Sequence, residues 1–266
     1  MKLSHLVPTS MLSELPEQQT THLALANLIT DDEEYRDFYC RLVTSGHTVI
    51  LDYPAHERLD IDLEQWLGAV EILRPSAVVL PDSIDSADET LLQAGIAIRM
   101  LLRKTLNQTP EYIGVPHGKT QKEYLACAEK LWRYGCRWFG ISLERQLSDA
   151  DALNLRQQRL EGLLTNTYTK TSKYHLLGIS ETASELIDPF FQEHCGTADA
   201  SKFAVWWLTS WDSAVPYPKD VPINRPYPGR KALGGSVDYF NYCGVSTGLQ
   251  WYLERWSVFA EKGEPE

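Results

Sequence analysis

The chain alternates between two kinds of segment. Short apolar runs rich in β-branched residues are typical of buried parallel strands, and the longer amphipathic stretches between them are typical of crossover helices. Six such runs predict strands, the first over residues 22–29, and a seventh strand is expected near residues 197–203. The six runs are HLALANLI, HTVILDY, SAVVLPD, EYIGVPHG, RWFGISL and KYHLLGIS, and the intervening helices are expected to stop before Gly46, Pro75, Pro110 and Gly135. The pattern does not identify an eighth strand.

Strand–helix units repeated roughly every 30 residues predict a (β/α)8 barrel of the TIM type. The 266 residues suit such a barrel as a single domain over residues 1–266. An open doubly wound sheet is the alternative, but no GxGxxG motif follows the first predicted strand. Residues 211–235 are dense in Pro and Gly and predict a long irregular loop after the seventh strand, and the stretch from Ser246 predicts a closing helix.

Composition narrows the class of protein. The formal charge of −11 disfavours nucleic-acid binding over the whole surface, although it leaves room for a local basic groove. The five cysteines are widely spaced with no CxxC motif, which argues against a compact zinc site or a disulfide scaffold and favours a reducing cytoplasm. No apolar run approaches the ~20 residues of a membrane span, and the N-terminus resembles neither a signal nor a transit peptide.

Polar side chains follow the predicted strands at their carboxyl ends, where βα barrels place their working residues. These are Asp52, Asp82, His117 and Asp199. Each alone has a structural alternative: Asp82 as the cap of the helix that begins near Ser86, the other two aspartates as turn residues, and His117 as a loop histidine. Together, at separate strand ends, they are better explained by a site.

Two kinds of chemistry use such a set. Paired carboxylates suit reactions at a glycosidic bond, and a further carboxylate can accept hydrogen bonds from the N–H/NH2 edge of a purine-like base. A metal site is the other use of several Asp and His residues in a barrel. No HxH motif lies near the first predicted strand, which disfavours a metal-dependent hydrolase.

The order of the motifs ILDYPAHE, VVLPDSIDSADET, YIGVPHG, WFGISL, HLLGIS and GTADAS resembles that of the tRNA-guanine transglycosylase superfamily. More particularly, it looks like the phage and bacterial branch that inserts 7-deazaguanine bases into DNA. The resemblance covers Leu23 to Phe203. It implies a glycosyltransferase (a pentosyltransferase) that needs no cofactor and exchanges guanine in DNA for a 7-deazaguanine such as preQ0.

The resemblance also implies a role for each matched residue. Asp199 matches the nucleophile that forms a covalent aspartyl-glycosyl intermediate, and Asp52 matches the general acid/base. Asp82 matches the residue that holds the edge of the guanine-like base. The remaining substrate-binding residues implied in this way are Tyr53, His117, Gly118 and Gly140, with His117 standing where the family usually has Gln.

The region after Asp199 is locally basic and rich in aromatic residues. Lys202, Arg225, Arg230 and Lys231 are expected to contact phosphates, with the aromatic side chains stacking on exposed bases. A solvated loop whose aromatic side chains pack on the barrel is the alternative. The expected partners are DNA, single-stranded or with a flipped nucleotide, and a 7-deazaguanine base, without a membrane. A homodimer or a partner from a modification system fits the same interpretation.

Three other functions stay open at the level of the sequence. The chain could be a tRNA-type transglycosylase, although the CxCxxC-plus-His zinc motif of those enzymes is absent. It could be a non-catalytic nucleic-acid-binding subunit on the same fold, or an unrelated barrel hydrolase. For the leading hypothesis we expect a cytoplasmic enzyme of a bacterial or phage-infected host cell.

Overall fold

A computed structural model describes residues 2–5, 9, 12, 20–53, 61–104, 109–144, 147–178, 185 and 188–200. The predicted loop over residues 211–235 and the predicted closing helix from Ser246 lie outside these residues. So do four of the predicted site residues, Lys202, Arg225, Arg230 and Lys231.

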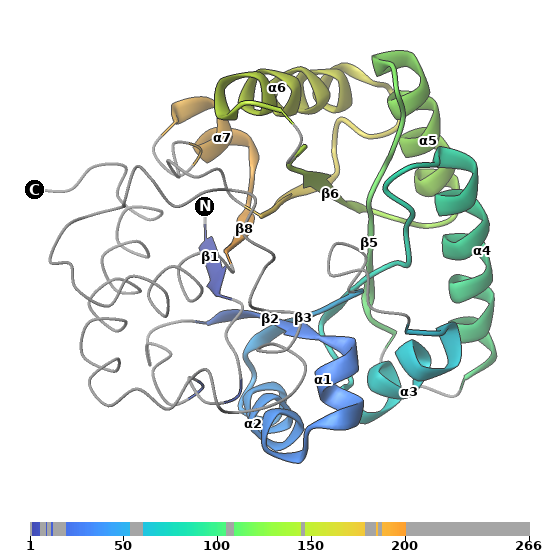
Figure 1. Cartoon of the computed structure of the whole chain (residues 1–266), viewed down its shortest axis with the longest axis vertical. Coiled ribbons are helices and arrows are strands. Elements are labelled where there is room, and N and C mark those ends of the chain that lie inside the picture. Colours follow the sequence, from blue (N-terminus) through green and yellow to red (C-terminus); the bar gives the residue numbers. More distant parts are fainter. Residues whose placement is uncertain are drawn as a thin grey trace, which may run out of the picture.

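The described strands form one parallel sheet that curls into a nearly closed, TIM-barrel-like α/β fold (Figure 1). Their order around the barrel is β1-β8-β7-β6-β5-β4-β3-β2. The two edge strands, β1 and β2, also approach each other, so the gap between them is small. The bounds are Lys2–His5 (β1), Thr21–Leu25 (β2), Thr48–Asp52 (β3), Ala77–Val79 (β4), Glu111–Gly114 (β5), Trp138–Ser142 (β6), Lys173–Leu177 (β7) and Thr197–Ala200 (β8).

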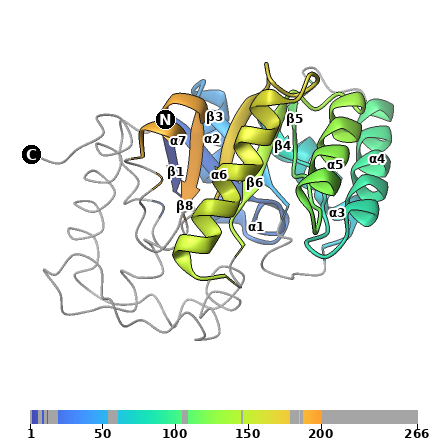
Figure 2. The ribbon, with the colours of Figure 1, turned by 90° about the horizontal axis from the view of Figure 1, so that it is seen from above.

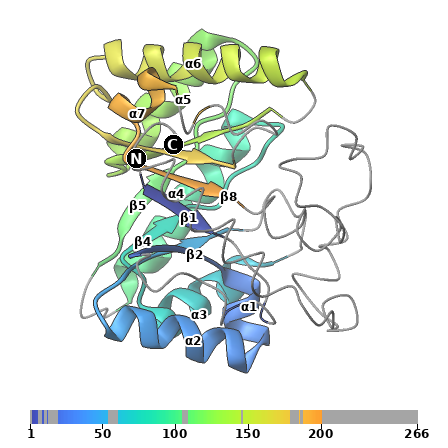
Figure 3. The same cartoon turned by 90° about the vertical axis from the view of Figure 1, so that its left-hand side faces the viewer.

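Helices join each consecutive pair of strands from β2 to β8 and cover the outside of the sheet (Figure 2). Viewed from the side, α6 and the α1–α3 group lie on opposite sides of the strands (Figure 3). The bounds are Ala26–Asp31 (α1), Glu33–Thr44 (α2), Leu63–Leu73 (α3), Ala87–Arg103 (α4), Gln121–Arg133 (α5), Asp149–Thr165 (α6) and Pro189–His194 (α7).

Short polar side chains begin these helices, as local capping chemistry predicts. Ser86 accepts a hydrogen bond from the backbone N–H of Glu89 at the start of α4. At the start of α5, Thr120 and Glu123 form a reciprocal capping box. Gly46 and Gly135 follow α2 and α5 with positive φ angles of 84° and 107°, a conformation that glycine adopts without a steric penalty.

The seven predicted strands are confirmed, but two details of the prediction are wrong. The first apolar run does not stay extended over residues 22–29, because the strand ends at Leu25 and α1 begins at Ala26. Apolar residues continue through both elements, and a buried strand and a short buried helix then have no distinguishing periodicity. The strand β1, with only four residues, was missed; it fills the position between β8 and β2.

Two glycines identify the inner face of the barrel. A Cβ on Gly140 would lie 2.6 Å from Leu177 Cδ1 and 3.2 Å from Val115 Cγ2, so side chains of the two neighbouring strand regions fill the space over it. A Cβ on Gly114 would instead lie 3.2 Å from Leu131 Cδ1 in α5. The face that carries Gly140 therefore points inward, and the face that carries Gly114 points toward the helices.

The strand register extends this inner face to the predicted catalytic residues. Gly140 is paired with His175, and His175 with Thr197. Because side chains alternate along a strand, Asp199 shares the face of Thr197. In the other direction around the barrel, the pairings through β5 and β4 place Asp52 at the end of β3 on the same face.

Candidate functional site

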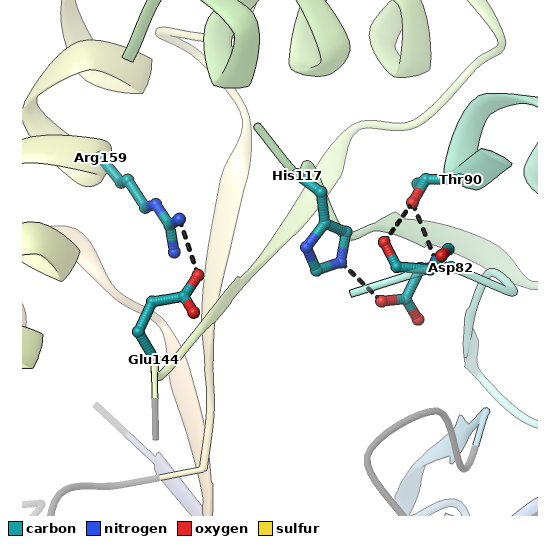
Figure 4. A network of polar contacts seen from close by, with 6 residues as sticks. Asp82, Thr90, His117, Glu144 and Arg159 are labelled. Atoms are coloured by element: carbon teal, nitrogen blue, oxygen red, sulfur yellow. Dashed lines mark hydrogen bonds and ion pairs between the residues drawn. The ribbon is translucent and has the colours of Figure 1, made fainter. Parts of the chain in front are cut away.

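Asp82 and His117 form a buried pair beyond the ends of β4 and β5. The imidazole Nε2 lies 2.7 Å from Asp82 Oδ2, and the exposed fractions of the two side chains are 4% for His117 and 5% for Asp82. Figure 4 shows the ring of His117 directed at the carboxylate. The alternative role of Asp82 as a helix cap is not observed, because Ser86 caps α4. The structure thus brings together two of the predicted substrate-binding residues.

Thr90 of α4 fixes the chain next to this pair. Its hydroxyl donates to the carbonyl of Ser83 at 3.0 Å and accepts from the N–H of the same residue at 2.9 Å (Figure 4). Thr90 is fully buried, and Ser83 is half-buried. The position of Asp82 is therefore set by its histidine partner and by the adjacent loop.

Asp199 is the centre of a second buried imidazole–carboxylate pair. Its Oδ1 accepts a hydrogen bond from the N–H of Gly178 at 2.9 Å and lies 3.1 Å from His175 Nε2. The other nitrogen of His175, Nδ1, lies 2.7 Å from Thr197 Oγ1. Both contacts of this carboxylate with the described part of the chain fall on Oδ1, and none falls on Oδ2. The arrangement holds the carboxylate by one oxygen.

His175 was not predicted from the sequence. It lies in the middle of the strand sequence KYHLL and is fully buried. A polar side chain at an inner position of a buried strand needs a hydrogen-bonding partner, which is the signal that would have identified it. Which partner it contacts depends on the neighbouring strand β8, about which the local sequence contains no information.

A buried ion pair lies behind Asp199. Arg156 of α6 donates from Nη1 to Glu185 Oε1 at 2.9 Å, and both side chains are 0% exposed. Burial lowers the pKa of the Arg156 guanidinium, while the negative charges of Glu185 and Asp199 oppose this effect. Arg156 Nη2 also donates to the carbonyl oxygen of Leu177 at 2.6 Å, and the N–H of the next residue, Gly178, binds Asp199. Sequence reasoning did not single out either member of the pair.

A second arginine of α6 makes a separate contact. Arg159 Nη2 lies 2.8 Å from Glu144 Oε1, and its guanidinium lies over the ring of Tyr124 at 4.8 Å from the ring centre. Figure 4 shows this pair apart from His117 and Asp82. The two arginines are three residues apart on α6 but contact different strand ends. Arg156 binds the carbonyl of Leu177 at the end of β7, and Arg159 binds Glu144, which follows β6.

Asp52 and Tyr53 are placed at the end of β3. Asp52 is half-buried. Burial raises the pKa of Tyr35 well above its usual value, and the negative charge of Asp52 makes a smaller contribution in the same direction. The hydroxyl of Tyr53, which the resemblance assigned to substrate binding, donates to the carbonyl of Ile61 at 3.2 Å. Asp52 and Asp199 share the inner face of the barrel, with β1 and β2 between their strands.

Gly118 and Gly140, both predicted to lie against the substrate, have packing reasons to be glycine. Gly140 leaves room for Leu177 and Val115 inside the barrel. A Cβ on Gly118 would overlap the backbone nitrogen of Tyr124 and lie 2.8 Å from the backbone carbon of Glu123. Close packing against the first turn of α5 thus accounts for Gly118 without a ligand.

We therefore expect Gly118→Ala to destabilise the protein by about 1–3 kcal/mol, because backbone atoms cannot rotate away from the added methyl group. The free energy of unfolding from urea titrations measures this. Gly68→Ala is the matched control: it lies in α3, and no atom lies within 4 Å of the added Cβ. The control should be neutral or stabilising by up to about 1 kcal/mol. Equal stability of the two variants would contradict the close packing.

Among the described residues, no group of three or more His, Cys, Asp or Glu side chains could hold a metal ion. Four cysteines in this part of the chain, Cys40, Cys127, Cys136 and Cys195, are free thiols. None of the described helices is both long enough and apolar enough to cross a membrane.

In comparisons with known proteins, no protein-family model matches the chain, and no curated protein matches it.

Proposed function

We propose that the protein is a base-exchange transglycosylase that replaces guanine in DNA with a 7-deazaguanine base. The observation that carries the proposal is the carboxylate of Asp199, which is buried at the end of β8 and held through Oδ1 by Gly178 and His175. A carboxylate fixed by one oxygen presents the other for attack on carbon. In this proposal the whole chain forms a single domain, a (β/α)8 barrel of the TIM type, which contains Asp199.

The proposed reaction consists of two displacements at the anomeric carbon. Asp199 Oδ2 attacks this carbon and forms a C–O bond while the C–N bond to guanine breaks, and guanine takes a proton from Asp52 as it leaves. The 7-deazaguanine then gives its ring N–H proton to Asp52 and attacks the same carbon, which releases the Asp199 carboxylate. Two inversions give net retention of configuration.

The buried pair of Asp82 and His117 supports recognition of a base. His117 occupies Oδ2 of Asp82, and a carboxylate has a second oxygen that can accept from the N–H/NH2 edge of a guanine-like ring. With one oxygen fixed by the imidazole, the carboxylate cannot rotate freely, so the base would be bound in one orientation.

Asp82→Asn should raise the KM for the base by roughly ten- to a hundredfold, because the amide presents a donor where an acceptor is needed. Asp52→Asn should instead lower kcat, with a loss that depends on pH, because it removes the group that transfers the proton. Steady-state kinetics with labelled guanine as the exchanging base separates the two effects. Equal effects of both variants on KM would contradict this division of roles.

The direct test is nucleoside analysis after incubation of the purified protein with preQ0 and, in parallel, double-stranded DNA, single-stranded DNA and tRNA. We expect a 7-deazaguanine nucleoside, detected by mass spectrometry, in at least one of the DNA samples and none in tRNA. Incorporation into tRNA alone would favour the tRNA-type alternative. No incorporation by the folded protein into any of the three substrates, with no covalent adduct on Asp199, would refute the proposed reaction.

A further inference from the structure

Two polar contacts meet on the single peptide group that joins Leu177 to Gly178. The carbonyl oxygen of Leu177 accepts a hydrogen bond from Arg156 Nη2 at 2.6 Å. The N–H of the same peptide group, which belongs to Gly178, donates to Asp199 Oδ1 at 2.9 Å. In a trans peptide the carbonyl and the N–H point in opposite directions. This one peptide group therefore connects the guanidinium of Arg156 to the carboxylate of Asp199.

The backbone conformation at this point depends on glycine. Gly178 has a φ of 66°, in the left-handed region that a side chain with a Cβ rarely adopts. The chain turns here immediately after β7 ends at Leu177. The peptide plane before this turn is held on both sides, by Arg156 on the carbonyl and by Asp199 on the N–H, and these contacts fix the direction of the N–H.

The contacts of Arg156 suit this task. Its two terminal nitrogens are divided between Glu185 and the Leu177 carbonyl, and its Nε makes no hydrogen bond with the described residues. The charge is therefore balanced by Glu185 while the second nitrogen remains directed at the peptide. A cationic donor on the carbonyl also polarises the peptide and strengthens its N–H as a donor.

We propose that Arg156 is a positioning residue for Asp199, which acts through the Leu177–Gly178 peptide and fixes the N–H that holds Oδ1. Together with His175 on the same oxygen, this leaves Oδ2 directed at the substrate. The effect on catalysis rests on the proposed function of Asp199 as a nucleophile. The positioning of the Asp199 carboxylate does not rest on that function, because it can be measured without a substrate.

The test compares matched double variants of the two arginines in α6. Arg156→Met with Glu185→Gln removes the buried pair without leaving an isolated charge. Arg159→Met with Glu144→Gln makes the same two changes at the neighbouring arginine, which pairs with Glu144 and stacks on Tyr124 instead. Stability and circular dichroism confirm that each variant is folded.

The first measurement is the NMR signal of the Gly178 amide. Labelling leucine with 13C at the carbonyl and glycine with 15N selects the three Leu–Gly peptides of the sequence, which end at Gly68, Gly178 and Gly234. The signal that moves in Asp199→Asn belongs to Gly178. We expect it to move upfield in the Arg156 double variant as well, and to stay in place in the Arg159 control. An unchanged signal in the folded Arg156 variant would overturn the proposal.

The second measurement is the base-exchange activity of the same proteins. A positioning role predicts a fall in kcat of about ten- to a hundredfold in the Arg156 variant, with little change in the KM for the base, because the nucleophile is misdirected while the base site is intact. A shifted Gly178 signal in a protein with no exchange activity would refute the proposed function and keep the positioning role. Normal kcat with a shifted signal would show that the contact of Arg156 with the Leu177–Gly178 peptide does not affect catalysis. This result would overturn the proposed catalytic effect of Arg156.

Two further measurements apply if the Arg156 double variant does not fold. Arg156→Lys keeps a charge beside Glu185 but lacks a second nitrogen for the Leu177 carbonyl, so a smaller upfield movement is expected. In the wild-type protein the Gly178 amide should be protected from hydrogen exchange and shifted downfield. A rapidly exchanging amide at an ordinary chemical shift would overturn the proposal without any variant.

Discussion

Asp199→Asn is expected to reduce base exchange by more than about a thousandfold while the fold survives. The carboxylate of Asp199 is the group that would carry the glycosyl moiety, and an amide is too weak a nucleophile to replace it. Asparagine is preferred to alanine because its carbonyl can still accept the hydrogen bond from Gly178. Exchange of labelled guanine into DNA measures the loss, and trapping of the covalent adduct should fail in the variant.

The control for this experiment is Asp62→Asn, which makes the same chemical change at the exposed cap of α3. It should keep full exchange activity. Near-normal exchange in Asp199→Asn, with an unchanged melting temperature, would assign the nucleophile to another residue. Asp212, which lies outside the described residues, would be the next candidate.

Glu185→Ala should cost about 3–5 kcal/mol of unfolding free energy, which is the largest stability effect that we expect from one substitution here. The change leaves the guanidinium of Arg156 buried without its counter-ion, because both side chains of the pair are 0% exposed. Urea denaturation followed by tryptophan fluorescence gives the free energy.

Glu71→Ala is the matched comparison for the ion pair. Glu71 pairs with Lys104 at 3.1 Å, but the two side chains are 41% and 38% exposed, so water screens the interaction. Loss of such a surface pair should cost no more than about 1 kcal/mol. If Glu185→Ala were equally mild, Arg156 would have found another acceptor, and the pair would not be a structural requirement of the fold.

The proposed division of roles separates two carboxylates by their surroundings. Asp82 contacts the imidazole of His117. Asp199 contacts the imidazole of His175 and the N–H of Gly178, and Arg156 binds the carbonyl of the same peptide group. The first arrangement suits a fixed acceptor for a base edge, and the second suits a nucleophile with one restrained oxygen. Variants of Asp82 should accordingly raise the KM for the base, whereas variants of Asp199 should lower kcat.

The sequence alone determined most of the secondary structure and the strand ends at which the site residues lie. Apolar runs, amphipathic stretches and stop signals such as Gly135 act within a few residues of one another, so a local pattern is enough to identify them. It also placed Asp82 and Asp199 near the carboxyl ends of strands. It failed where local signals are weak, at the four-residue β1 and at the boundary between β2 and α1.

Only the tertiary structure decided which polar groups meet. His175 reaches Asp199 because β7 and β8 pair in one particular register, and Arg156 reaches Glu185 and the Leu177 carbonyl from a helix 21 or more residues away in the chain. It likewise decided that Gly118 packs on the first turn of α5. Such contacts depend on how strands and helices are packed, and a buried polar group carries no mark in the sequence of the partner that satisfies it.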